Sequence, residues 1–218
     1  MASERLTREQ SKAQTKARLL SAARKVFARR GYHGASVEEI AAEAGFSTGA
    51  LYSNFDGKED LFLALMDHEI DAYSEEISAA VVGLASVADR ARDGARHWME
   101  IVEREPEMLM LFVEFWAYAA RDAAVRERVA ASFAKARRGL TKLIDDGARE
   151  FDLHLELPAE HLAIAIDALA DGIARQKLAD PSAVPDDLMG RVLSLLLSGA
   201  ARPLALAPAV AEGERPSV

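Results

Sequence analysis

Cysteine is absent from the 218-residue chain. Its absence excludes disulfide bonds, zinc fingers with thiolate ligands and thiol redox sensing, and it fits a cytoplasmic protein. No apolar run approaches the length of a membrane span, and the N-terminus is charged rather than apolar. We therefore expect neither a transmembrane helix nor a secretory signal.

The residue patterns of catalysis are also missing. The chain contains no glycine-rich phosphate loop and no nucleophile motif. Its five histidines are scattered, and no pair has the spacing of a metal site: His33, His68, His97, His154 and His161. We therefore predict that the protein is not an enzyme and that it has no catalytic residue, no metal site and no cofactor.

The most informative stretch runs from residue 36 to residue 55 and predicts two short helices joined by a tight turn. Ser36 can cap the first helix, and Glu39 lies three residues on, as in a capping box. Gly45 can adopt the left-handed conformation that ends a helix, and Ser47 can cap the next one. The inward positions are apolar at helical spacing: Val37, Ile40, Ala41, Ala44, Leu51 and Phe55. This pattern is typical of a helix-turn-helix, which many proteins insert into the major groove of DNA.

Two further helices frame this unit. Upstream, apolar residues repeat at helical spacing and are followed by Gly31: Leu19, Ala23, Val26 and Phe27. Downstream, Asp56 and Glu59 predict a second capping box ahead of a long apolar stripe: Leu61, Phe62, Leu65, Met66, Ile70, Tyr73 and Ile77. Three predicted caps between two periodic helices make the helix-turn-helix much more specific than the bare pattern.

Residues 12–66 resemble the N-terminal signature of the TetR family of transcriptional regulators. The matching positions are Phe27, Gly31, Tyr32, Ser36, Ile40, Ala41, Ala44, Gly45, Phe46, Ser47, Gly49, Leu51, Tyr52, Phe55, Lys58 and Leu61. The resemblance implies an all-α fold of about nine helices. An N-terminal three-helix helix-turn-helix domain would precede a C-terminal helical domain that binds a ligand and dimerises. It further implies a palindromic operator in double-stranded DNA, a homodimer formed through the last two helices, and a small-molecule effector.

The second helix of the pair would contact the bases. Thr48 and Gly49 lie at its N-terminus, where a small side chain lets the backbone approach the groove and a hydroxyl and a methyl can meet a base edge. Tyr52 lies one turn on. Leu51 and Phe55 already fill the inward face, which favours a DNA contact for Tyr52 over a half-buried packing role. With the resemblance, which places Tyr52 and Lys58 on the DNA backbone, the candidate DNA-binding residues are Ser36, Ser47, Thr48, Gly49, Tyr52, Ser53, Asn54 and Lys58.

The net charge of −8 is unusual for a DNA-binding protein until its distribution is considered. Residues 1–30 carry nine Lys and Arg against Glu4 and Glu9, a net +7, so the remainder carries −15. A basic end on an acidic body can orient a protein on DNA. Beside a helix-turn-helix we favour this interpretation over a merely solvated helix face, and we expect Arg30 to add a phosphate contact.

Most of the remaining chain predicts helices with short breaks. We expect helices over residues 11–30, 37–44, 48–54, from 57 past 77, 87–104, 108–120, 122–151, from 159 on, and 188–197, with an extended piece around 152–157. We divide the chain into a disordered arm (1–10), the helix-turn-helix DNA-binding domain (11–57), a helical ligand-binding and dimerisation domain (58–201) and a disordered tail (202–218).

Large soft side chains gather in residues 97–118. Two interpretations fit these residues. A helix that is apolar on both faces is usually deeply buried, and such side chains can also line a pocket for a small apolar or aromatic ligand. The candidate ligand-binding residues are Trp98, Met108, Phe112, Phe115 and Trp116. Glu114 lies inside this apolar helix, where it would pair with a buried arginine, bind a cationic ligand or face solvent.

Small residues recur in the last two helices: Ala163, Ala165, Ala168, Ala170, Gly172 and Ala174. They allow helices to approach closely, either within an ordinary core or between two subunits, and we expect a dimer because a short DNA-reading helix needs a symmetric second copy. The sequence thus predicts a dimeric, ligand-responsive transcriptional regulator, most often a repressor. A ligand-independent or architectural DNA-binding protein is the alternative.

Overall fold

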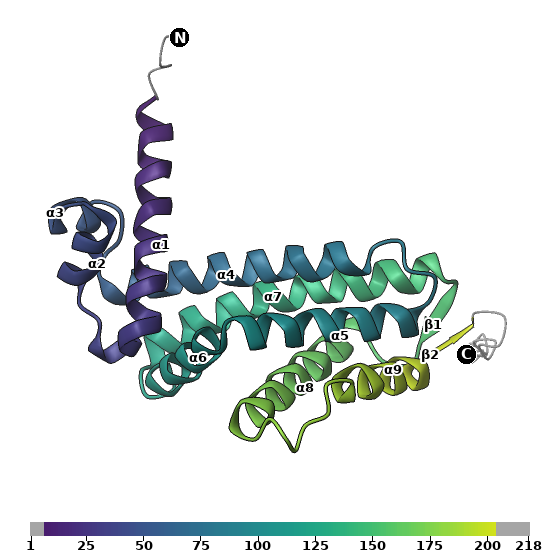
Figure 1. Cartoon of the computed structure of the whole chain (residues 1–218). Helices are drawn as coiled ribbons and strands as arrows, with labels where there is room; N and C mark the ends of the chain where they lie inside the picture. Colours follow the sequence, from purple (N-terminus) through teal and green to yellow (C-terminus); the bar gives the residue numbers. More distant parts are fainter. Residues whose placement is uncertain (1–6, 204–218) are drawn as a thin grey trace, which may run out of the picture. The chain divides into compact units, whose positions relative to one another are not determined.

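The computed structural model describes residues 7–203, and this part of the chain is almost entirely helical (Figure 1). It contains nine helices and two short strands. They are α1 (Arg8–Gly34), α2 (Val37–Ala44), α3 (Thr48–Tyr52), α4 (Lys58–Val81), α5 (Val87–Arg104), α6 (Pro106–Ala119), α7 (Ala123–Glu150), β1 (Leu153–Leu155), α8 (Ala159–Ala179), α9 (Leu188–Ala200) and β2 (Ala201–Pro203). The predicted all-α fold is confirmed. Within residues 7–203, no helix is both long enough and apolar enough to cross a membrane.

The chain forms two compact units. The first, here called the reader unit, combines the chain up to residue 76 with residues 99–136. The second, the body unit, combines residues 77–98 with the chain from residue 137 on. This division differs from the predicted boundary after residue 57, because the first part of α4 and all of α6 pack with the helix-turn-helix.

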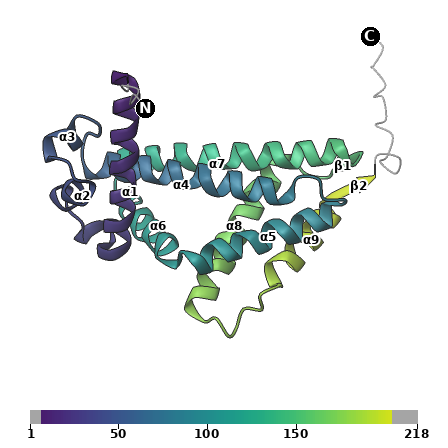
Figure 2. The same cartoon turned by 45° about the horizontal axis from the view of Figure 1, so that its top comes forward.

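Stacked aromatic rings form the centre of the reader unit. Phe62 of α4 stacks on Phe115 of α6 with ring centroids 4.1 Å apart, and Phe27 of α1 meets the edge of Phe62 at 5.2 Å. Tyr32 packs edge-on against Phe115 at 4.8 Å. These four side chains are buried in one apolar core, which extends to Leu51 in α3. Helix α6 is therefore a structural part of the unit that holds the helix-turn-helix, and Figure 2 shows it beside the lower end of α1.

Helix α1 begins earlier than predicted. Thr7 Oγ1 accepts a hydrogen bond from Gln10 N (3.2 Å), and Gln10 Oε1 accepts one from Thr7 N (2.8 Å), so the two residues form a complete capping box. Residues 8–10 are helical, which corrects that part of the predicted disordered arm; residues 1–6 lie outside the described residues. At the other end, Arg202 and Pro203 of the predicted tail belong to β2, and residues 204–218 lie outside the described part.

A carboxylate from α6 holds the last turn of α1. Gly31 interrupts α1 with φ 69° and ψ 171°, a region that is essentially restricted to glycine. Just beyond it, Tyr32 N donates to Glu114 Oε2 and His33 N donates to Glu114 Oε1, both at 3.1 Å. The buried arginine considered as a partner for Glu114 is not found in the described part of the chain, where its carboxylate accepts from two backbone amides instead.

Both predicted capping boxes form differently. Ser36 Oγ accepts from Glu39 N at 3.1 Å as expected, but the Glu39 carboxylate pairs with Arg29 and Arg30 instead of returning to Ser36. At the start of α4, Asp56 N donates to Asp60 Oδ2 (3.2 Å) instead of entering a box with Glu59. The carboxylates of Glu39 and Glu59 both pair with a basic residue from another helix, which for Glu59 is Arg128. Such partners belong to other helices and override the local pattern.

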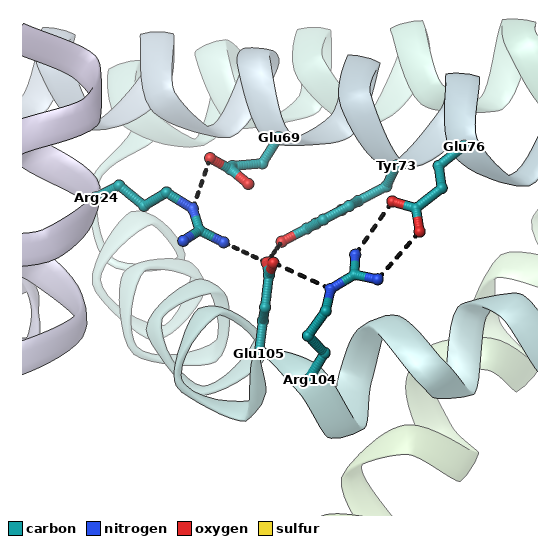
Figure 3. A network of polar contacts seen from close by, with 6 residues as sticks. All are labelled: Arg24, Glu69, Tyr73, Glu76, Arg104 and Glu105. Carbon is teal, nitrogen blue, oxygen red and sulfur yellow. Dashed lines mark hydrogen bonds and ion pairs between the residues drawn. The ribbon is translucent and has the colours of Figure 1, made fainter. Parts of the chain in front are cut away.

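A polar network joins α1, α4 and the junction between α5 and α6 (Figure 3). Arg24 of α1 pairs with the buried carboxylate of Glu69 (3.1 Å) and with Glu105, which also accepts a hydrogen bond from Tyr73 Oη at 2.6 Å. At its far end, Arg104 pairs through two nitrogens with Glu76. Burial raises the pKa of Tyr73, and its hydrogen bond to Glu105 acts in the same direction. For Glu105, burial acts against ionisation, but the hydrogen bond from Tyr73 and the charge of Arg24 outweigh it and lower the pKa.

The body unit consists of helices and one small antiparallel sheet. Strand β1 pairs with β2, with Leu153 opposite Pro203 and Leu155 opposite Ala201, which places the predicted extended piece. Helix α9 approaches α5 closely at the buried Gly190, because a Cβ there would lie 3.3 Å from the Cα of Arg92.

Candidate nucleic-acid interface

The turn between α2 and α3 is built around Gly45, which has φ 72° as predicted. Gly45 N donates to Ala42 O and Phe46 N donates to Ala41 O, so the carbonyls that end α2 are satisfied. Arg18 of α1 donates to Ala44 O at 2.9 Å and lies over the Phe46 ring at 4.6 Å. The turn is therefore fixed both by its own backbone and by a cation from α1.

Helix α3 presents one buried and one open face. Leu51 and Phe55 are buried in the core, which fixes the helix in rotation. Tyr52 lies on the opposite side with 55% of its surface exposed, and Gly49 is exposed beside it while Thr48 is half-buried. Within residues 7–203 no hydrogen bond engages the Tyr52 hydroxyl. The outward face of α3 therefore offers a free hydroxyl, a bare stretch of backbone and the Thr48 side chain.

Two other predicted contacts turn back onto the protein. Ser53 Oγ donates to Gly49 O and Asn54 Nδ2 donates to Ala50 O, both at 2.8 Å. Asn54 Oδ1 is buried and has no partner in the described part of the chain. Helix α3 ends at Tyr52, two residues short of the predicted end, and these two side chains close its C-terminus.

The two capping serines remain accessible. Ser36 and Ser47 are exposed, and their hydroxyl oxygens accept from Glu39 N (3.1 Å) and Ala50 N (3.2 Å). A hydroxyl that accepts in this way still has its own proton to donate. Both serines can therefore cap a helix and donate to a phosphate oxygen at the same time.

Lys58 is largely engaged within the protein. Its Nζ donates to Tyr32 O at 2.9 Å and to Ala35 O at 3.1 Å, and it lies over the Tyr32 ring at 4.7 Å. An ammonium has three donors, so one is left for a phosphate. The main contact of Lys58 joins the start of α4 to the end of α1.

The basic residues in the second half of α1 are paired with carboxylates. Arg24 pairs with Glu69 and Glu105, and the other pairs are Lys25 with Glu43, Arg29 with Glu39 and Glu43, and Arg30 with Glu39. Hydrogen bonds from Arg29 and Arg30 lower the pKa of Glu39. Arg30 is therefore tied to α2, so the phosphate contact expected of it is not supported, and residues 24–30 contribute less positive surface than their composition suggests.

The five candidate ligand-binding residues are divided between the two units. Met108 and Phe115 are fully buried in the reader-unit core, and Phe112 packs against it. Trp116 lies on the surface of the same unit with 58% exposure. Trp98 belongs to the body unit, where its indole N–H donates to Ala170 O (3.4 Å). Helix α6 thus has one buried and one exposed face, which differs from the expectation of a helix buried on both faces.

Comparisons with known proteins agree with this architecture. The family model described as bacterial regulatory proteins, tetR family, matches residues 19–65, and the model described as BetI-type transcriptional repressor, C-terminal, matches residues 87–201, more than half of the chain. The chain is 32% identical to the transcriptional activator FasR of Mycolicibacterium smegmatis over 50% of this chain and 48% of that protein. It is 28% identical to the transcriptional regulator TtgR of Pseudomonas putida over 86% of this chain and 90% of that protein. The chain therefore spans about half of FasR and most of TtgR.

Solved structures share the fold. A TetR-family regulator from Rhodococcus sp. superposes with a TM-score of 0.72 at 21% identity, covering 86% of this chain and 98% of that one. The regulator FadR of Bacillus subtilis, solved in complex with stearoyl-CoA, superposes with a TM-score of 0.66 at 17% identity, covering 83% and 96%. At these identities the likeness extends to the fold alone.

Proposed function

Because the chain belongs to the TetR family of bacterial transcriptional regulators, we propose that it is a dimeric repressor that binds a palindromic operator and is released by a small-molecule effector. The observation that carries the DNA-binding part is the open face of α3. Leu51 and Phe55 are buried and fix the helix, so Thr48, Gly49 and Tyr52 face away from the core. Ser36 and Ser47 flank this face with hydroxyls that can donate to phosphates.

The dimer would form through α8 and α9. Leu195 of α9 is 76% exposed and Ile164 of α8 is 46% exposed, although both are large and apolar. A Cβ added to Gly172 or Gly199 would meet no atom within 4 Å. A glycine inside a helix costs about 1 kcal/mol relative to alanine, and no packing within the subunit explains these two. Close approach of a second copy would account for the open glycines and the exposed apolar side chains together.

A small organic effector is supported by the FadR complex with stearoyl-CoA. We do not place the effector on Met108 or Phe115, because the reader-unit core takes up both side chains. Effector binding would favour a dimer state with a different spacing of the two α3 helices. The expected coupling is about 1–3 kcal/mol, a change of roughly 5- to 150-fold in operator affinity.

Selection of genomic DNA fragments by the purified full chain tests this proposal. We expect a few fragments that share a palindrome, and we expect Tyr52→Ala to lower affinity for them at least tenfold. Tyr52→Phe separates the contribution of the hydroxyl from that of the ring. Trp116→Ala removes an equally exposed aromatic side chain from α6 and serves as the matched control, with unchanged binding.

The same experiment at two salt concentrations addresses the architectural alternative. Uniform binding across fragments that collapses with salt and ignores Tyr52 would mean that only non-specific phosphate contacts act. In that case the protein would be a general DNA-binding protein, and the specific-repressor proposal would be wrong.

A further inference from the structure

The first three turns of α1 extend beyond the helix-turn-helix core. Residues 7–18 contain no buried side chain, and burial begins at Leu19. In Figure 1 these turns project past α2 and α3, which belong to the same compact unit. The Thr7–Gln10 capping box closes the helix at its free end, so this projection is an ordered rod and not a loose arm.

The basic residues of the projecting turns differ from those in the rest of α1 in their pairing. Arg8, Lys12 and Lys16 have no carboxylate partner within residues 7–203, whereas the basic residues from Arg24 to Arg30 are all paired. Arg18 is held by a backbone carbonyl and an aromatic ring. Along α1, the positive charge that no carboxylate neutralises therefore lies in the first half of the helix, on the projecting turns and at Arg18.

Helix geometry places the three cations in one row. They are spaced four residues apart, so they lie within an arc of about 80° and span about 12 Å along the axis. Lys16 fixes the direction of the row, because its Nζ lies 5.6 Å from the ring centroid of Phe55, which directly follows α3 and its closing turn. Lys12 and Arg8 continue from there, one and two turns further from the core.

We propose that Arg8, Lys12 and Lys16 form a second DNA-contacting element that binds backbone phosphates outside the groove occupied by α3. This inference rests on the proposed function and lengthens the operator that each subunit covers. A row of about 12 Å is long enough for each of the three cations to meet its own phosphate, since each strand of B-DNA carries one phosphate per about 3.4 Å of helix axis. The contacts carry charge but no base recognition, so they raise affinity for operator and non-operator DNA alike.

An anionic membrane is the other polyanion that a basic helix can meet. Helices that lie in a membrane surface need an apolar face with large side chains to enter the acyl region. Residues 8–18 are Arg, Glu, Gln, Ser, Lys, Ala, Gln, Thr, Lys, Ala and Arg, and alanine is the largest apolar side chain among them. The composition therefore favours phosphates of DNA.

The test measures binding of the full-length protein to a duplex recovered by the wild-type chain in the fragment selection. The variant is the triple substitution Arg8→Gln, Lys12→Gln and Lys16→Gln. Its matched control is Arg138→Gln, Lys142→Gln and Arg149→Gln, which removes the same charge from exposed positions of α7 in the body unit. Affinity is measured over a salt series on that duplex and on one trimmed by three base pairs at each end. Circular dichroism checks that both variants fold, and Lys12→Gln alone replaces the triple variant if the latter does not.

We expect the slope of log affinity against log salt to become shallower by about 0.9 for each phosphate that the variant no longer neutralises, while the control keeps the wild-type slope. Trimming should weaken wild-type binding at least fivefold and leave the triple variant unchanged. The proposal is overturned if the triple variant matches the control in both measurements. The proposal is also overturned if the triple variant loses a retention on phosphatidylglycerol vesicles that the wild-type chain shows, while its salt slope for DNA binding stays unchanged. That result would assign the row to a membrane. If the wild-type chain selects no fragments, the proposed function fails and this inference fails with it.

Discussion

Replacing Glu114 with alanine should destabilise the reader unit, although the residue is polar and only half-buried. The carboxylate accepts from Tyr32 N and His33 N at 3.1 Å each, directly after the Gly31 interruption of α1. A hydrogen bond to a charged group contributes about 1.5–3 kcal/mol. The His33 amide lies near solvent and can turn to water, so we expect the free energy of unfolding to fall by about 2 kcal/mol.

Gly31 provides an internal check on this reasoning. A Cβ at Gly31 would lie 2.8 Å from Glu114 Oε2, and the backbone there has φ 69°. Gly31→Ala therefore suffers from backbone strain of about 1–3 kcal/mol and from displacement of the carboxylate. In the Glu114→Ala background only the strain remains. We expect the double variant to be less destabilised than the sum of the single variants by about 1 kcal/mol.

Urea denaturation followed by circular dichroism at 222 nm measures these differences, at one fixed protein concentration because the protein is proposed to dimerise. Glu107→Ala is the matched control, since Glu107 is an exposed glutamate on the same helix. Its change should stay within about 0.5 kcal/mol. A Glu114→Ala variant as stable as Glu107→Ala, or strict additivity with Gly31→Ala, would refute the role assigned to the carboxylate.

Three further predictions concern the core, the polar network and the dimer. Phe115→Ala should lower the free energy of unfolding in urea by about 3–5 kcal/mol because the ring is fully buried, whereas Trp116→Ala next to it should lower it by under about 1 kcal/mol. Equal losses would contradict the assignment of buried and exposed faces to α6. Because folding lowers the pKa of Glu105, its carboxylate stabilises the folded state at pH values above its unfolded pKa of about 4.3, and this stabilisation is lost as the pH falls through the folded pKa. Tyr73→Phe removes a hydrogen bond that lowers this pKa, so it should flatten the acid limb of a stability–pH profile. An unchanged limb would count against the network. Leu195→Glu should convert a dimer to a monomer in analytical ultracentrifugation, and a persistent dimer would place the interface elsewhere.

Local patterns in the sequence were sufficient to predict the helix-turn-helix. The turn at Gly45 and the serine caps depend on interactions within a few residues, and each occurs where the sequence predicts it. Helix α5 has the predicted bounds, Val87–Arg104, because a short break precedes it and Pro106 follows it. The cap at Thr7 obeys the same local rule, since Gln10 stands three residues on, and the sequence interpretation missed it.

Contacts between distant helices could not be predicted from such patterns. Phe115 and Trp116 are adjacent and similarly apolar, and only the packing of α6 against α1 and α4 decides which one is buried. Glu39 fits a capping box by its spacing, but two arginines one helix earlier in the chain compete for its carboxylate and win. A carboxylate is attracted more strongly to a guanidinium than to a neutral backbone amide because both partners of the ion pair are charged, so the arginines prevail.

The distribution of positive charge along α1 depends both on the local sequence and on contacts between helices. Composition alone gives nine basic residues in the first 30 and suggests a uniformly basic surface. Folding pairs the later ones, from Arg24 to Arg30, with carboxylates of α2, α4 and the α5–α6 junction, so they stabilise the reader unit. Substituting a paired arginine should therefore lower the free energy of unfolding and leave the salt dependence of DNA binding unchanged, while substituting Lys12 should do the opposite. Arg29→Gln and Lys12→Gln remove one charge each from the same helix, so a shared effect on both quantities would show that the two halves of α1 are not distinct.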